Sequence, residues 1–98
     1  MRRKACLIFN PVAGSNNSEQ ELERIKELLS PQLDLDIQLT TKEKGADKLG
    51  QEAVNKDFEI IIAAGGDGTV SITAKALSET NISLGVIQRG TVNAFDSA

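Results

Sequence analysis

The chain has 98 residues, of which 40% are hydrophobic and 26% charged, so it is long enough for one small domain. Its formal net charge of −3 and its lack of a broad basic face argue against nucleic acid as a partner, because nucleic-acid binders neutralise backbone phosphates with lysine and arginine. One cysteine and no histidine exclude an internal disulfide and the commonest zinc sites, and no stretch approaches the ~20 apolar residues of a membrane span.

The N-terminal half predicts a strand, a helix and a second strand. Residues Lys4–Asn10 form an apolar run typical of a buried strand, in which Cys6 is expected to be a buried, inert thiol. Ser18 and Glu21 match the capping-box pattern of a helix start, after the turn-forming residues 11–17. The apolar face of that helix comprises Leu22, Ile25, Leu28 and Leu29, Pro31 ends it, and residues 33–39 alternate apolar and polar as in a strand with one face in water.

The C-terminal half continues the alternation of strands and helices. It predicts a helix over 46–56, a strand over 58–64, a helix over 70–79 and a short strand over 84–87, and a fourth helix begins at Val92 or Asn93. This order predicts an α/β fold with three layers, α/β/α, in which a parallel sheet with right-handed crossovers has helices on both faces. We expect residues 1–98 to form one nucleotide-binding domain.

The most informative motif is Gly65-Gly66-Asp67-Gly68-Thr69, called the glycine loop below, which follows the most hydrophobic strand. Glycines tolerate positive φ and let the backbone approach a ligand, and the helix that follows offers unpaired N–H groups to an anion. Asp67 fits such a loop if a divalent cation lies between its carboxylate and the phosphates. The alternative is an ordinary glycine-rich turn between strand and helix.

Polar and glycine residues follow each predicted strand. The carboxyl ends of parallel strands meet at one edge of the sheet, where ligands bind. The residues gathered there are Asn10–Gly14, Thr40 and Thr41, the glycine loop, and Arg89–Thr91. Each also has a structural interpretation: Asn10 as a loop hydrogen-bond partner, Gly14 as a turn glycine, Thr41 as a β-former or helix cap, Arg89 as a surface charge and Asn93 as a helix cap.

Three motifs in order resemble the N-terminal half of the diacylglycerol kinase catalytic domain. They are Asn10-Pro11-x-x-Gly14, the glycine loop and Gly85-x-Ile87-x-x-Gly90-Thr91-x-Asn93, and the resemblance covers essentially the whole chain. The family includes bacterial lipid kinases and is similar to sphingosine and ceramide kinases. The Gly-Gly-Asp-Gly motif alone would also suit NAD kinases and phosphofructokinases.

The resemblance implies the nucleotide-binding part of a lipid kinase that phosphorylates a diacylglycerol-like or sphingoid hydroxyl with Mg-ATP, on a phosphofructokinase-like or NAD-kinase-like domain. It implies Asp67 as the magnesium residue, direct or through water, and no residue of the chain as the catalytic base. It implies that ATP contacts Asn10, Pro11, Gly14, Thr41, Gly65, Gly66, Asp67, Gly68, Thr69, Gly90 and Thr91. In the family a second, β-rich domain completes the lipid site, so the chain resembles a truncated form and is expected to be inactive alone.

The sequence departs from the family at two positions. The family usually has proline where Gln88 stands, which leaves the shape of that loop open, and an acid where Ile72 stands. The apolar Ile72 favours a non-catalytic nucleotide-binding or self-associating module as an alternative, beside an NAD-kinase-like phosphotransferase. An uncovered fourth strand, with Val86, Ile87, Val92 and Phe95, predicts a homodimer or other self-association. The lack of a signal peptide predicts a cytoplasmic protein, peripheral to the membrane in its full-length form.

Overall fold

Four parallel strands form one sheet in the order β2-β1-β3-β4 in a computed structural model, which describes residues 2–12 and 18–88. The strands are β1 (Arg3–Phe9), β2 (Leu33–Leu39), β3 (Ile60–Gly65) and β4 (Ser83–Gln88), and the helices are α1 (Ser18–Leu29), α2 (Ala46–Val54) and α3 (Asp67–Ala76). The two central strands, β1 and β3, are almost completely buried from Ala5 and from Ile61 onward, as expected for strands covered on both faces.

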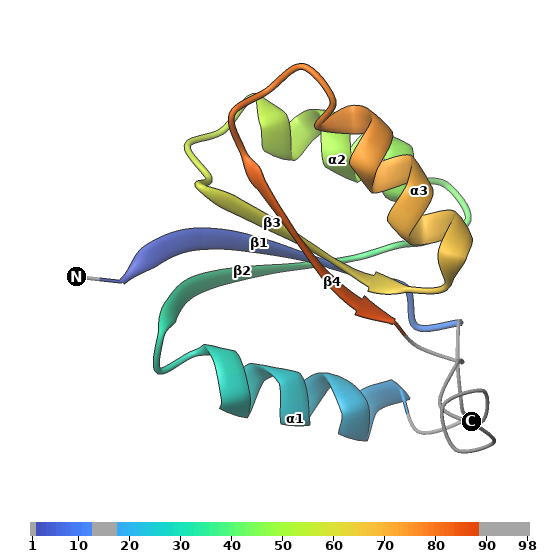
Figure 1. Ribbon diagram of the computed structural model, residues 1–98. Coiled ribbons are helices and arrows are strands. Elements are labelled where there is room, and N and C mark those ends of the chain that lie inside the picture. The colour runs from blue at the N-terminus through green and yellow to red at the C-terminus, as the bar shows by residue number, and fades with distance from the viewer. Residues whose placement is uncertain (1, 13–17, 89–98) are drawn as a thin grey trace, which may run out of the picture.

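Helices cover both faces of the sheet, α1 on one and the pair α2 and α3 on the other (Figure 1). Cys6, Ile8 and Ile61 belong to the core cluster on the α2/α3 face. The cluster on the α1 face contains Leu7, Phe9 and Ile62 among its members. This arrangement confirms the predicted three-layer α/β/α fold with a parallel sheet.

The two helices on the same face pack closely because a glycine lies at their contact. Gly50 is buried, and a Cβ atom built on it would lie 3.0 Å from the Cβ of Ala76 on α3. Ala46, Leu49, Gly50 and Ala53 are the buried residues of α2.

Several predicted details differ from the structure. Helix α3 begins at Asp67 instead of Val70, because Gly66 is its N-cap, and it ends at Ala76 instead of Glu79. The helical period places Leu28 on the buried face of α1, but Leu28 is 65% exposed, because the cluster on that face meets the narrower stripe of Leu22, Ile25 and Leu29.

Strand β2 is an edge strand, and its polar side is only partly in water. Leu33, Leu35 and Ile37 pack against the α1 cluster, as the alternation predicts. On the opposite side Asp36 and Gln38 are half-buried, and Gln38 Nε2 donates a hydrogen bond of 3.1 Å to Asp36 Oδ2.

Strand β4 forms the other edge of the sheet. Leu84 and Val86 are 37% and 47% exposed, whereas Ile87 is half-buried and packs against the α1 cluster, so the expectation that Ile87 lacks cover is wrong. The expectations for Val92 and Phe95 lie outside the described residues. Over 2–12 and 18–88, the helices are all too short or too polar to cross a bilayer.

Candidate functional site

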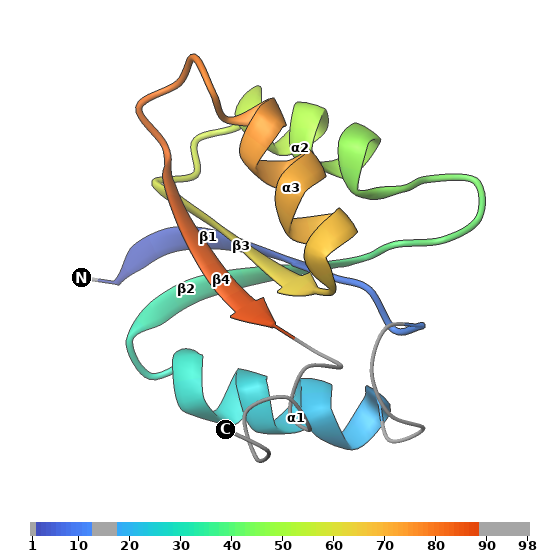
Figure 2. The same cartoon turned by 45° about the vertical axis from the view of Figure 1, so that its right-hand side comes forward.

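The strand order places a topological switch point between the carboxyl ends of β1 and β3. From β1 the chain moves outward to β2 and then returns to the other side of β1 as β3, so the direction of winding reverses between these two strands. Ligands of open α/β sheets bind outside the carboxyl ends of the strands at such a point. Two segments follow these ends: Asn10–Val12 after β1 and the glycine loop after β3 (Figure 2).

Helix α3 starts within the glycine loop, where no side chain of residues 2–12 or 18–88 caps it. Gly66, the N-cap, is extended with φ −83° and ψ −172°, and no side chain bonds to the cap. The first bond of the helix runs from the N–H of Val70 to the carbonyl of Gly66, at 3.1 Å. The N–H groups of Asp67, Gly68 and Thr69 have no acceptor within the helix. They can therefore donate hydrogen bonds to an anion, which the positive end of the helix dipole also attracts.

The three glycines of the loop have different roles. A Cβ atom on Gly65 would lie 2.7 Å from Thr69 Oγ1 and 2.8 Å from Thr69 Cβ, so Gly65 lets the strand end pack against the helix. Among the described residues, a Cβ atom on Gly66 or Gly68 would meet no atom within 4 Å beyond its chain neighbours and the backbone of its own helix. None of the three has a positive φ, so conformational freedom does not explain them. Gly66 and Gly68 therefore leave the open surface on which a ligand can approach the backbone.

Asn10 joins the loop after β1 to the glycine loop. Its Nδ2 donates a hydrogen bond of 3.3 Å to Thr69 Oγ1, and its Oδ1 accepts one of 3.0 Å from the N–H of Val12. Thr69 is only 8% exposed, and its carbonyl accepts the hydroxyl of fully buried Thr73 at 2.8 Å. The structure thus brings Asn10 and Thr69 together, as expected from their places at one sheet edge.

Asp67 is exposed in the first turn of α3, and its Oδ1 accepts a hydrogen bond of 3.3 Å from Gln88 Nε2. The part of the chain that the structure describes holds no group of three or more histidine, cysteine, aspartate or glutamate side chains that would form a metal site alone. One exposed carboxylate beside a phosphate-accepting helix end fits Mg²⁺, which proteins often hold with one or two carboxylates together with substrate phosphates.

The contact of Gln88 with Asp67 is a feature that sequence reasoning missed. Gln88 is paired in register with Gly65 at the end of β4, so it lies beside the loop that carries Asp67. Only the strand order and the register bring the two residues together, and neither can be read from the motif itself.

Two of the remaining predicted site residues, Thr41 and Pro11, lie within the described part of the chain. Thr41 follows β2, and its Oγ1 accepts a hydrogen bond of 3.0 Å from the N–H of Lys44 in a turn before α2. Pro11 lies in a half-buried turn position next to Asn10. Gly14, Gly90 and Thr91 lie outside the described residues, as do Arg89 and Asn93.

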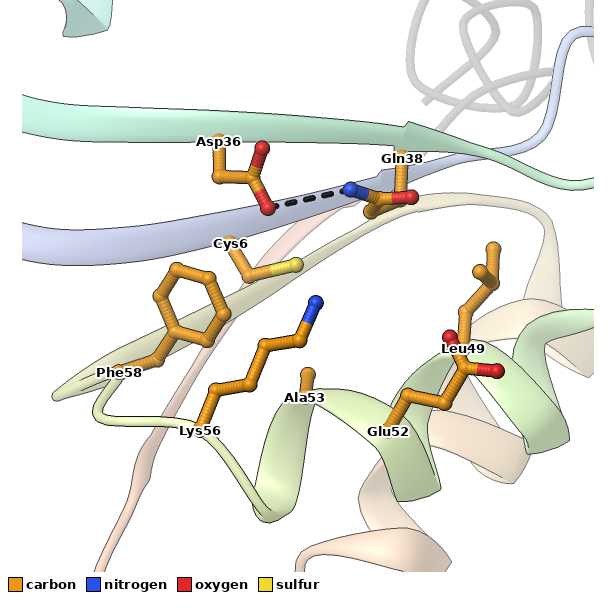
Figure 3. Close-up of a pocket in the computed structure, with 8 residues that line it drawn as sticks. All are labelled: Cys6, Asp36, Gln38, Leu49, Glu52, Ala53, Lys56 and Phe58. Atoms are coloured by element: carbon orange, nitrogen blue, oxygen red, sulfur yellow. Dashed lines mark hydrogen bonds between the residues drawn. The ribbon is translucent and has the colours of Figure 1, made fainter.

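Cys6 lines a small pocket together with residues of β2 and α2 (Figure 3). The Asp36 carboxylate and the Lys56 ammonium point toward the space beside the sulfur, which has room for about one water molecule. Burial, and then the charge of Asp36, raise the pKa of the Cys6 thiol to about 11. The thiol is therefore protonated at neutral pH, which agrees with the predicted inert cysteine.

The chain is similar in sequence and fold to several known proteins, among them proteins described as diacylglycerol kinases. Residues 4–98 match the profile of the diacylglycerol kinase catalytic domain. The chain is 33% identical over 101 residues to a diacylglycerol kinase of Staphylococcus aureus (100% of this chain, 32% of that protein) and 48% identical over 103 residues to an uncharacterised protein of Synechocystis sp. (94% and 24%).

The fold agrees with a crystal structure of a diacylglycerol kinase from Bacillus anthracis, with a TM-score of 0.79 and 35% identity over 97% of this chain and 36% of that one. The chain thus spans between 24% and 36% of the length of these relatives. Since the profile match runs through nearly every element described above, from β1 to β4, the chain belongs to the diacylglycerol kinase catalytic domain family.

Proposed function

We propose that the chain binds Mg-ATP at the carboxyl ends of β1 and β3, as the nucleotide-binding part of a kinase that phosphorylates a lipid hydroxyl. The observation that carries the proposal is the start of α3 at the point where the sheet changes its direction of winding: among the described residues, no side chain caps this helix end and none lies beside Gly66 or Gly68. Family membership supports ATP as the phosphate donor.

In this proposal the residues of the glycine loop bind the phosphates. The backbone N–H groups at the start of α3 donate hydrogen bonds to phosphate oxygens, and the open faces of Gly66 and Gly68 permit close approach. Asp67 holds the magnesium ion, directly or through water, with Gln88 orienting its carboxylate. Magnesium, when bound, neutralises charge on the phosphate oxygens, which phosphoryl transfer requires.

The acceptor is proposed to be a diacylglycerol-like or sphingoid lipid. Transfer also needs a group that accepts the proton of the lipid hydroxyl, and we assign no residue of this chain to that role. The chain covers 32% of the Staphylococcus aureus kinase and 36% of the Bacillus anthracis one, so we propose that the acceptor site and the base belong to the remaining part of such proteins. A lipid acceptor implies that the full-length kinase works as a peripheral protein at a membrane surface.

The test is a titration of the chain with Mg-ATP, followed by the shifts of backbone amide signals. We expect the largest shifts at Gly66, Asp67 and Gly68, with a dissociation constant between about 1 μM and 1 mM, which corresponds to roughly −8 to −4 kcal/mol. No shift at these three residues in millimolar Mg-ATP would contradict the proposal.

Asp67→Asn separates the role of the metal from that of the loop. This variant keeps the size of the side chain and removes its charge, so it is expected to weaken binding of ATP mainly when magnesium is present. The matched control is Asp47→Asn, which removes the equivalent first-turn acid of α2 and should leave the affinity unchanged. An equal loss with and without magnesium in Asp67→Asn would show that Asp67 supports the loop and not a metal.

A further inference from the structure

We propose that Asn10 and Thr69 are positioning residues that hold the loop after β1 and the glycine loop as one unit, instead of contacting the nucleotide. The inference rests on the proposed nucleotide site, and it reassigns two residues that the family resemblance had placed in contact with ATP. Its basis is the direct hydrogen bond between side chains 59 positions apart in the sequence, which joins the end of β1 to the start of α3.

Thr69 faces the protein interior. Only 8% of the residue is exposed, and its side chain fills the space beside Gly65, where any added Cβ atom would overlap it. Its neighbours in the loop, Asp67 and Gly68, are exposed. A ligand approaching the start of α3 therefore meets the backbone and these two residues, while the Thr69 hydroxyl remains behind them.

Asn10 uses both polar atoms of its side chain within the protein. Nδ2 donates to Thr69 Oγ1, Oδ1 accepts from the N–H of Val12, and the backbone N–H of Asn10 donates to the carbonyl of Ala64 at 2.9 Å. These three bonds connect the loop after β1 with the end of β3 and with α3. A side chain held in this way fixes the relative positions of the two loops.

This coupling has a specific consequence for affinity. If the two loops bind phosphate as one unit, removing either partner of the Asn10–Thr69 hydrogen bond displaces the same phosphate-binding surface. Each single variant then weakens binding by about three- to tenfold, the range expected for one neutral hydrogen bond, and the double variant weakens it no further.

The experiment is a double-mutant cycle with Asn10→Ala and Thr69→Val, measured as the dissociation constant of Mg-ATP by calorimetry. We expect Asn10→Ala to cost at most about twofold in the Thr69→Val background, and Thr69→Ser to restore most of the wild-type affinity because it keeps the hydroxyl. Additive losses, or a loss with Asn10→Ala and none with Thr69→Val, would overturn the proposal, because Asn10 would then act on the nucleotide directly.

Thr73→Val is the matched control. Thr73 lies one turn further along α3, is fully buried and also uses its hydroxyl within the protein, but its bond goes to the carbonyl of Thr69 and not to the loop after β1. The control variant is expected to change the unfolding temperature and leave the affinity for Mg-ATP unchanged.

A second readout needs no nucleotide. In the free protein, Asn10→Ala and Thr69→Val are expected to shift the amide signals of Gly66 and Gly68 in the same direction, and Thr73→Val is not. If the wild-type chain fails to bind Mg-ATP, the proposed function is wrong while this comparison still decides the coupling. Unchanged signals of Gly66 and Gly68 in both variants would overturn it.

Discussion

Two glycines of the glycine loop, Gly65 and Gly68, should respond in opposite ways to the same substitution. Gly65→Ala places a methyl group within 2.7–3.0 Å of three side-chain atoms of Thr69, so either the strand end or the helix must move. Overpacking of this kind costs roughly 1–3 kcal/mol. For a domain of this size each kcal/mol corresponds to roughly 4–8 °C, so the unfolding temperature should fall by about 4–24 °C.

Gly68→Ala should instead raise the unfolding temperature. Gly68 is the second residue of α3, its φ is not left-handed, and an added methyl group meets no atom within 4 Å in the described part of the chain beyond the backbone of its own helix. Replacing a helical glycine by alanine gains up to about 0.5–1 kcal/mol, or roughly 2–8 °C. The same methyl group would occupy the surface on which we propose that phosphate binds, so the affinity for Mg-ATP should fall.

Thermal unfolding by circular dichroism and the dissociation constant of Mg-ATP measure the two effects separately. Gly50→Ala is the control for packing away from the site, since its methyl group would meet Ala76; it should lower the unfolding temperature and leave the affinity unchanged in the fraction that is folded. A Gly68→Ala variant that binds Mg-ATP as tightly as the wild type would refute the assignment of the open glycines to phosphate binding.

Further predictions concern pH, assembly and the surface. Because the pKa of Cys6 is about 11 when folded and 9.0 unfolded, the unfolded state loses the proton first as the pH rises, so stability should fall between about pH 9 and 11, by up to about 2–3 kcal/mol. Urea unfolding should show this loss in the wild type and a smaller one in Cys6→Ala. Sedimentation equilibrium should detect association of the wild-type chain that Val86→Lys weakens, since Val86 is exposed on an edge strand; a wild type that stays monomeric at high micromolar concentration would contradict this. Glu59→Gln removes an exposed ion pair with Arg3 and should change the free energy of unfolding by less than about 1 kcal/mol.

The layers and the sheet could be predicted because hydrophobic periodicity depends on the local sequence. The apolar run of β3 and the alternation in β2 each identify a strand without knowledge of the rest of the chain. Details that depend on a partner element could not be predicted. Leu28 shares the period of its helix and yet faces water, and Asp36 on the polar side of β2 is half-buried because α2 covers it.

The same limit applies to the candidate site. Glycine, acidic and hydroxyl residues in one short motif indicate a phosphate loop, but residue type alone does not distinguish Gly65 from Gly68. That difference depends on the packing of Thr69. The side chain of Thr69 lies against Gly65 and accepts a hydrogen bond from Asn10, which lies at the end of another strand. The predicted start of α3 is wrong for a related reason, since glycine and aspartate are poor helix formers and only the geometry of Gly66 shows that the helix includes Asp67 and Gly68.

The position of β1 in the middle of the sheet also has a consequence for how the chain folds. Ala5 is paired with Ile60, so 55 residues separate partners that lie side by side. During synthesis β1 leaves the ribosome first and can pair with β2, but its other edge stays open until β3 has emerged. Closing so long a loop before any contact is gained makes folding slow, and the open edge is a strand whose residues Ala5–Phe9 are all apolar. The nascent chain is therefore most exposed to aggregation before β3 is complete, and this interval is the one in which a chaperone would improve its yield.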